Sequence, residues 1–156
     1  MKKKIIIATI TAFTLSLGAT ALAATSDSAK TIASKIVPAS AEFTYVKDDG
    51  KEYDVYFRDT AQNTRYKVEV NKITDQVKEV SMKTTDRGGE SIKISEEQVR
   101  NIIRQDYPDA NIYKIETDYE HGKIKYEAKF TSSSIKKGEY EINAETGSVI
   151  EKSLKY

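Results

Sequence analysis

The chain has 156 residues, of which 38% are hydrophobic and 31% are charged, and its formal net charge at pH 7 is +1. This near balance argues against nucleic acid or an anionic membrane surface as the main partner. The chain contains no Cys, which excludes disulfide bonds and a cysteine nucleophile, so core packing alone must stabilise the fold.

Residues 1–23 have the pattern of a secretory signal peptide. Lysines at positions 2–4 precede an apolar stretch that ends near residue 18, and Ala-Leu-Ala at 21–23 supplies the small residues that signal peptidase recognises. We predict cleavage between Ala23 and Ala24 and export to the cell envelope or the medium, after which no stable membrane span is left. The alternative is a retained anchor, because the segment approaches the ~20 residues that span a bilayer.

A short helix is the first element predicted after the cleavage site. Thr25 is a suitable N-cap, and Pro38 ends the helix. The apolar residues between them share one helical face: Ala29, Ile32, Ala33 and Val37. Because alanine side chains bury little area, we expect this helix to pack less firmly than the second one.

Four strand-like segments follow this helix and are separated by turn residues. They are Glu42–Lys47, Glu52–Asp59, Thr64–Val70 and Gln76–Lys83. The sequence TTDRGGE (Thr84–Glu90) then joins the two halves, and Gly88-Gly89 is predicted to be the hinge or linker.

The second half repeats this order of elements. Ser95 is a good N-cap, Gln98 completes a capping box, and Pro108 ends the helix. Its apolar face consists of Val99, Ile102, Ile103 and Tyr107. The strand-like segments are Asn111–Thr117, Lys123–Thr131, Gly138–Ala144 and Ser148–Leu154. Apolar and charged residues alternate in IKYEAKF (Ile124–Phe130), which indicates that one face of the sheet is buried and the other exposed.

The two halves are related as an internal repeat. When the sequence is shifted by 72, seven of the fifteen residues of Glu69–Lys83 are identical to those of Glu141–Lys155. The sequence therefore predicts an α+β protein of two tandem units, residues 24–84 and 94–156, separated by a linker at 85–93. Each unit is predicted to be one N-terminal helix packed on a small antiparallel β-meander of three to four strands.

The second unit resembles a PepSY domain. The resemblance rests on the Ser-Glu-Glu start of its helix at 95–97, the Pro after it, the Gly-Lys turn before the strand with Tyr126, and above all YEINAETGSVIE (Tyr140–Glu151). The first unit is similar but more divergent, since Asp75 stands where the second unit has Gly147. The resemblance implies an exported, non-enzymatic protein that binds a secreted or envelope protein and inhibits or modulates a peptidase. It supplies no catalytic residues.

No group of residues in the sequence has a catalytic or metal-binding signature. His121 is the only histidine, and although it could share a metal with Asp118 and Glu120, a solvated turn is the simpler interpretation. The segment DTAQNT (Asp59–Thr64) lacks the ligand spacing of a calcium loop and is predicted to be a hairpin loop. We therefore predict no catalytic, cofactor-binding or metal-binding residues.

The ten tyrosines are the compositional feature that bears on binding. Four of them are predicted to line the helix-facing side of the sheet: Tyr53, Tyr66, Tyr126 and Tyr140. Tyr56 falls on the polar side of its strand and is the best candidate for an exposed aromatic residue at a protein interface.

Two functions are compatible with these patterns. The first is the protein-binding module described above. The alternative is a protein that binds or senses a small ligand, a peptide or a cell-wall glycan, which would need a concave apolar pocket between the units. The charged residues of the last strand, Glu151, Lys152 and Lys155, would suit an edge of the sheet, where a partner's strand could add.

Overall fold

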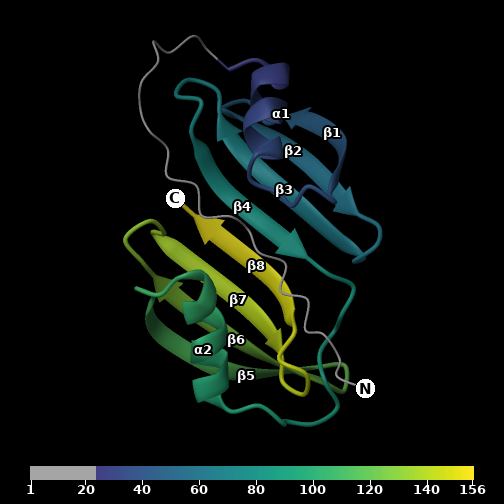
Figure 1. Ribbon diagram of the computed structural model, residues 1–156, viewed down its shortest axis with the longest axis vertical. Coiled ribbons are helices and arrows are strands. Elements are labelled where there is room, and N and C mark those ends of the chain that lie inside the picture. The colour runs from purple at the N-terminus through teal and green to yellow at the C-terminus, as the bar shows by residue number, and fades with distance from the viewer. Residues whose placement is uncertain (1–23) are drawn as a thin grey trace.

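The computed structural model describes residues 24–156, and the predicted signal peptide lies outside the described residues. The chain forms an antiparallel sheet of eight strands with two helices, an α+β fold (Figure 1). The helices are α1 (Ser26–Ser34) and α2 (Glu96–Asp106). The strands are β1 (Glu42–Asp48), β2 (Glu52–Asp59), β3 (Thr64–Asn71), β4 (Val77–Lys83), β5 (Asn111–Glu120), β6 (Lys123–Thr131), β7 (Lys137–Asn143) and β8 (Val149–Lys155).

The last strand lies at the centre of the sheet. The strand order is β1-β2-β3-β4-β8-β7-β6-β5, so β1 to β4 and β5 to β8 each follow one another in chain order and meet where β4 pairs with β8 (Figure 1). The prediction that the last strand lies at an edge is therefore wrong, because β8 pairs with β4 on one side and with β7 on the other. The edges of the sheet are β1 and β5.

The junction between β4 and β8 places opposite charges across from each other. Glu79 faces Lys155 and Lys83 faces Glu151 in the register of the pair. The Lys83 Nζ lies 2.6 Å from Glu151 Oε2, and the Lys155 Nζ lies 3.4 Å from Glu79 Oε2. Such cross-strand pairs contribute only about 0.2–1 kcal/mol each, but they favour this register over a shifted one.

Both helices begin at the predicted N-caps. The Thr25 hydroxyl accepts a hydrogen bond from the Ser28 backbone N–H, and the Ser28 hydroxyl oxygen accepts one from the Thr25 N–H, which closes a capping box. Ser95 and Gln98 form the same reciprocal pair at the start of α2. These bonds satisfy N–H groups that have no partner within the helix.

Both helices cover the same face of the sheet (Figure 1). One row of residues, each directly opposite the next, crosses all eight strands on this face: Phe43, Phe57, Tyr66, Met82, Lys152, Tyr140, Ala128 and Ile115. The Lys30 ammonium of α1 lies 4.1 Å from the centre of the Phe43 ring, and the Tyr140 hydroxyl donates a hydrogen bond to Asp106 of α2. The row therefore runs under both helices.

The core lies between the helices and this face. Tyr66, Tyr126 and Tyr140 are buried, and Tyr53 is partly buried against the core, as the alternation of the strands predicts. The opposite face carries the charged residues of the same strands. Within residues 24–156, no helix has both the length and the apolar character that crossing a membrane requires.

The same turn closes each half. The Asn71 Oδ1 accepts hydrogen bonds from the N–H groups of Ile73 and Thr74, and the Asn143 Oδ1 accepts them from Glu145 and Thr146. Asp75 and Gly147 then occupy the corresponding positions with φ of 54° and 75°. A glycine adopts this conformation without strain, whereas Asp is one of the few other residues that tolerate it.

The segment between the halves, in which the sequence predicts a hinge or linker at Gly88 and Gly89, is packed against the second half. Gly89 and Ile124 exchange two backbone hydrogen bonds of 2.9 and 2.8 Å. A Cβ atom on Gly88 would lie 2.7 Å from the Ile124 carbonyl oxygen, and one on Gly89 would lie 2.4 Å from the Glu145 Cβ. These glycines allow close backbone approach instead of flexibility.

Candidate binding site

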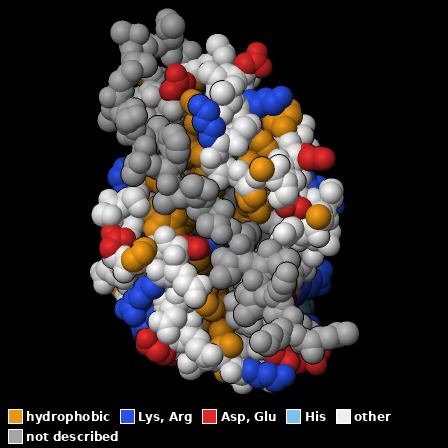
Figure 2. Space-filling view, in the orientation of Figure 1, with side chains coloured by type: hydrophobic (Ala, Val, Ile, Leu, Met, Phe, Trp, Pro, Cys, Tyr) orange, Lys and Arg blue, Asp and Glu red, His pale blue; other side chains and the backbone are white. Residues whose placement is uncertain are grey.

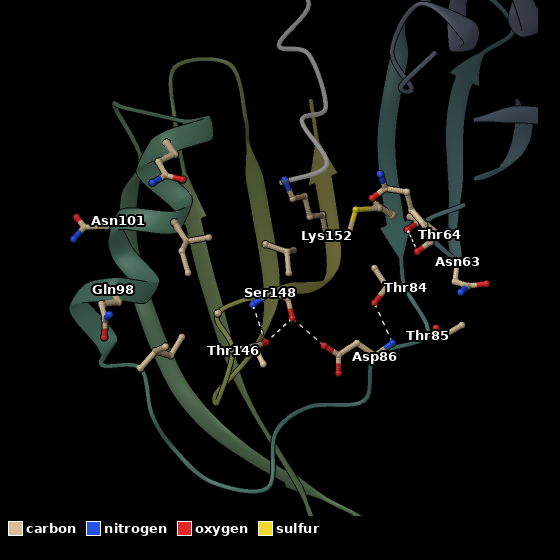
Figure 3. A pocket seen from close by; sticks show the side chains of 17 residues that line it. Asn63, Thr64, Thr84, Thr85, Asp86, Gln98, Asn101, Thr146, Ser148 and Lys152 are labelled. Carbon is tan, nitrogen blue, oxygen red and sulfur yellow. Dashed lines mark hydrogen bonds between the residues drawn. The ribbon is translucent and has the colours of Figure 1, made fainter. Parts of the chain in front are cut away.

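A pocket of about 530 Å³ lies between α2 and the centre of the sheet (Figure 3). Its walls come from the β2–β3 loop, the end of β4, the segment after β4, α2 and the β7–β8 turn. The volume falls in the range of about 300–1,000 Å³ that is usual for ligand pockets. Because residues from both halves of the chain line it, the pocket meets the requirement stated above for a small-ligand or peptide site.

Four apolar side chains, Met82, Ile94, Ile102 and Val149, form the floor of the pocket. Met82 is 1% exposed, and Ile94, Ile102 and Val149 are partly buried against the core. Ile102 and Ile103 lie on the same turn of α2. Ile103 is buried in the core, whereas Ile102 lines the pocket. Gly147 lies beside these residues. A Cβ atom at this position would lie 3.5 Å from the Ile102 Cδ1 and would fill the space next to it.

Lys152 is the charged residue within the apolar row of the sheet. It lies opposite Met82, its side chain is 1% exposed, and its Nζ lies 2.5 Å from the Asp106 Oδ2. Its Nζ also lies 4.7 Å from the centre of the Tyr140 ring, and the Tyr140 hydroxyl donates a 2.8 Å hydrogen bond to the same Asp106 oxygen. Burial lowers the pKa of Lys152, and the charge of Asp106 opposes that shift. Lys152 is thus held in place as one half of an ion pair.

Asp86 organises the opposite rim of the pocket, next to the β7–β8 turn (Figure 3). Its carboxylate accepts hydrogen bonds from the Gly88 N–H at 2.9 Å, the Asn143 amide at 3.0 Å and the Ser148 hydroxyl at 2.9 Å. Burial opposes the ionisation of Asp86, but these donors outweigh it and lower the pKa of the carboxyl group. The carboxylate therefore fixes the segment after β4 to the second half.

Side-chain amides and hydroxyl groups make up much of the rest of the lining. Gln98 and Asn101 project from α2, with Asn101 turned away from Lys152, while Asn63 and Thr64 stand on the far wall (Figure 3). In the space-filling view, hydrophobic side chains are visible at several places along the middle of this face, and charged side chains lie mostly toward its outline (Figure 2).

The residues discussed as metal candidates in the sequence lie away from this pocket. His121 is exposed in the β5–β6 turn, with φ of 50° and its Nδ1 3.6 Å from Glu120. Asp118 and Glu120 each lie 3.5 Å from the Lys125 Nζ. Among residues 24–156, no group of three or more His, Cys, Asp or Glu side chains has the geometry to hold a metal ion.

The predictions for the loop at residues 59–64 and for the exposure of Tyr56 have different outcomes. Residues 59–64 do connect β2 and β3, and Gln62 and Asn63 of this loop line the pocket, which the sequence did not indicate. Tyr56 is only partly exposed, because its ring stacks on Tyr45 with 4.4 Å between the ring centres. The large exposed aromatic residues lie instead on the edge strands: Phe43, Tyr45, Tyr113 and Tyr119.

Comparison with known proteins identifies the second half of the chain. Residues 93–152 match the PepSY family, described as "Peptidase propeptide and YPEB domain". A solved structure described as the Bacillus megaterium YpeB C-terminal domain shares the fold, with a TM-score of 0.50 and 13% identity over 83% of this chain. This chain spans 62% of that one, and no curated protein matches the sequence significantly. Residues 93–152, which include α2 and the pocket-lining turn before β8, are thus the part of the chain that matches the PepSY family.

Proposed function

We propose that this chain is an exported, non-enzymatic protein that binds a protein partner in the cell envelope or outside the cell and modulates a peptidase. The observation that carries the proposal is the match of residues 93–152 to a family described by its peptidase propeptides. A propeptide acts on its peptidase by binding to it, so the function requires a complementary surface and no catalytic group of its own.

The geometry of the pocket supports a binding role. The pocket is concave, it is partly apolar, and it is built largely by α2 and the β7–β8 turn of the PepSY domain. Its shape is maintained by hydrogen bonds of Asp86 and by the Lys152–Asp106 ion pair. A pocket that is formed in advance loses little conformational entropy when a partner binds.

We also propose that residues 24–84 are a first, degenerate PepSY-like unit, that residues 85–93 link the units, and that residues 94–156 are the second PepSY-like unit. Three features support this division: the 72-residue sequence repeat, the capping boxes of both helices, and the matching turns at Asn71 and Asn143. The first unit then has a positional role, because its loop at 60–63 and Met82 complete one wall of the pocket.

The pocket lined by residues of both halves favours a second function. The same pocket could hold a small ligand, a peptide or a cell-wall glycan, which would make the chain a binding or sensing protein without a peptidase partner. The two functions differ in what the pocket contacts: a loop of a large protein in the first, a free molecule in the second.

Crosslinking tests the leading proposal. Tagged residues 24–156 would be crosslinked in the envelope fraction of the source cells, and captured proteins would be identified by mass spectrometry. We expect a peptidase or a peptidase-associated protein among them, and a change in its activity on a casein substrate when residues 24–156 are added. Recovery of no specific protein, together with unchanged secreted peptidase activity, would refute the proposal.

A further inference from the structure

We infer that the pocket between α2 and the β4–β8 junction takes an uncharged, extended peptide segment through its aliphatic side chains. The inference rests on the proposed function, because it specifies which part of a protein partner the pocket recognises. It is carried by the charges, the apolar floor and the hydrogen-bonding groups of the residues that line the pocket.

The charge balance of the pocket disfavours an ionic ligand. Among the described residues that line it, Asp86 and Lys152 are the ionisable ones. Lys152 is already paired with Asp106, and the carboxylate of Asp86 already accepts four hydrogen bonds at 2.9–3.0 Å. A carboxylate or an ammonium of a ligand would have to compete with these contacts while losing its own hydration.

The floor favours aliphatic groups over sugars and nucleobases. It is formed by Met82, Ile94, Ile102 and Val149, and no aromatic side chain is present among the described residues of the lining. Sugar rings and bases are usually bound by stacking on aromatic side chains, as bases are on single-strand-binding proteins. Met is flexible and adapts to different aliphatic shapes, which suits recognition of several related side chains.

Two amide side chains on opposite walls can pair with a peptide backbone. Gln62 lies on the β2–β3 loop and Gln105 on α2, and within residues 24–156 neither side chain has a hydrogen-bond partner. An amide both donates and accepts, so it can pair with a peptide N–H and a peptide C=O. The pocket volume of about 530 Å³ leaves room for about two or three residues of such a segment.

A single reporter in the pocket makes the inference testable. The chain has two methionines, Met1 and Met82, so residues 24–156 prepared with a removable tag contain Met82 alone. Labelling the methionine methyl group with ¹³C therefore gives one NMR signal from the pocket floor. The probes are acetylated and amidated peptides of the form Ala-Ala-X-X-Ala with X as Leu, Phe, Glu or Lys, and a soluble peptidoglycan glycan fragment.

We expect the Leu peptide to shift the Met82 signal saturably at millimolar concentration, and the Glu and Lys peptides and the glycan to leave it unchanged. Ile102→Lys, which places a charge in the pocket, should abolish the shift, whereas Ile73→Lys, at a site 74% exposed in the first half, should retain it. Gln62→Ala and Gln105→Ala, both at exposed positions that leave the core intact, should each weaken binding by about 2- to 10-fold.

The outcomes separate this inference from the proposed function. A shift caused by the glycan or by a charged peptide, or no shift with any peptide, would overturn the inference. If Ile102→Lys crosslinks the same envelope partner as the parent protein, the partner uses another surface, so the inference fails and the proposed function stands. If the Leu peptide binds but no partner is captured, the proposed function fails and the pocket's specificity stands.

Discussion

Lys152 and Asp106 form an ion pair inside the protein, with 2.5 Å between Nζ and Oδ2 and with 1% and 9% of the two side chains exposed. Asp106→Asn keeps an acceptor for the Tyr140 hydroxyl but removes the charge that balances the lysine. Because removal of one partner of a buried ion pair costs about 3–5 kcal/mol, we expect a loss of that size in the free energy of unfolding, measured by urea denaturation at pH 7.

The double variant Lys152→Met/Asp106→Asn is the matched control for this prediction. It removes both charges, so most of the lost stability should return, because a buried ion pair is often no better than an apolar replacement. Glu151→Ala, which removes an exposed pair with Lys83, should cost only about 0–1 kcal/mol. Equal costs for Asp106→Asn and Glu151→Ala would show that the Lys152 ammonium is accessible to water.

The protein should lose stability steeply in alkaline solution. Burial raises the pKa of Tyr66 to about 12 and also raises the pKa values of Tyr107 and Tyr140. Unfolded tyrosines ionise near pH 10, so above that pH the folded state holds protons that the unfolded state has lost, and the free energy of unfolding falls as pH rises. Burial lowers the pKa of Lys152, so this residue makes the free energy of unfolding rise with pH. It is a single group, however, and the three tyrosines act in the opposite direction.

Tyr66→Phe isolates this effect. It should reduce the slope of stability against pH by up to about 1.4 kcal/mol per pH unit between pH 10 and 12, measured by denaturation at several pH values. Tyr119→Phe, at a position 68% exposed, should leave the slope unchanged. An unaltered slope in Tyr66→Phe would mean that the Tyr66 hydroxyl ionises in the folded protein as easily as in the unfolded chain.

A row of three carboxylates predicts a second pH effect. Glu69 lies directly between Asp54 and Glu79 on neighbouring strands. Burial raises the pKa of Glu69, helped by the like charges beside it and opposed by the hydrogen bond from Lys67. The folded state therefore binds a proton more tightly than the unfolded state, so this stabilisation is present below the unfolded pKa and is lost as pH rises through the folded pKa.

Glu69→Gln should remove this dependence. Relative to the parent protein, its stability should rise by about 0.2–1 kcal/mol between pH 4 and 7, the usual size of a cross-strand like-charge effect. Glu141→Gln, at the corresponding position of β7, is the parallel case, because Glu141 also faces two carboxylates, Glu127 and Glu151, and lies 2.9 Å from the Lys125 Nζ. A Glu69→Gln variant that loses stability over this range would contradict the raised pKa.

The glycines after β4 provide a test of the rigid connection. Gly88→Ala would place a Cβ at a φ of 114° and 2.7 Å from the Ile124 carbonyl oxygen, so it should cost at least about 2 kcal/mol in thermal or urea denaturation. Gly50→Ala, with φ of 72° and open space around it, should cost only the backbone strain of about 1–2 kcal/mol. If both cost the same, the segment is free to move away from β6.

The local elements could be predicted from the sequence because they depend on neighbouring residues. The caps at Thr25 and Ser95 and the alternation of Ile124–Phe130 each follow from a pattern that short segments display. The central place of β8 could not be predicted, because charges such as Glu151 occur both on edge strands and on the exposed face of central ones. Lys152 alternates with Ile150 and Leu154, so its inward direction was visible, but the partner that makes burial tolerable was not.

The pocket was beyond sequence reasoning for a related reason. It brings Gln62 and Met82 of the first half next to Ile102 and Val149 of the second, and their proximity depends on the pairing of β4 with β8. A sequence repeat predicts that two units resemble each other, but it does not predict which strands join them. The general expectation of a concave apolar site between the units could therefore be stated, whereas its residues could not.

The register at the middle of the sheet also has the symmetry of a homodimer interface. Ser81 faces Ser153, 72 positions later, and Glu79 and Lys83 meet Lys155 and Glu151 in mirrored order. Since β4 and β8 share four of their seven residues, including the glutamate, serine and lysine that face each other, each strand carries an edge that is complementary to itself, which defines an isologous contact. A separate unit ending in such a strand would pair with a second copy of itself at a rate that depends on concentration, whereas within one chain the same contact forms at any concentration.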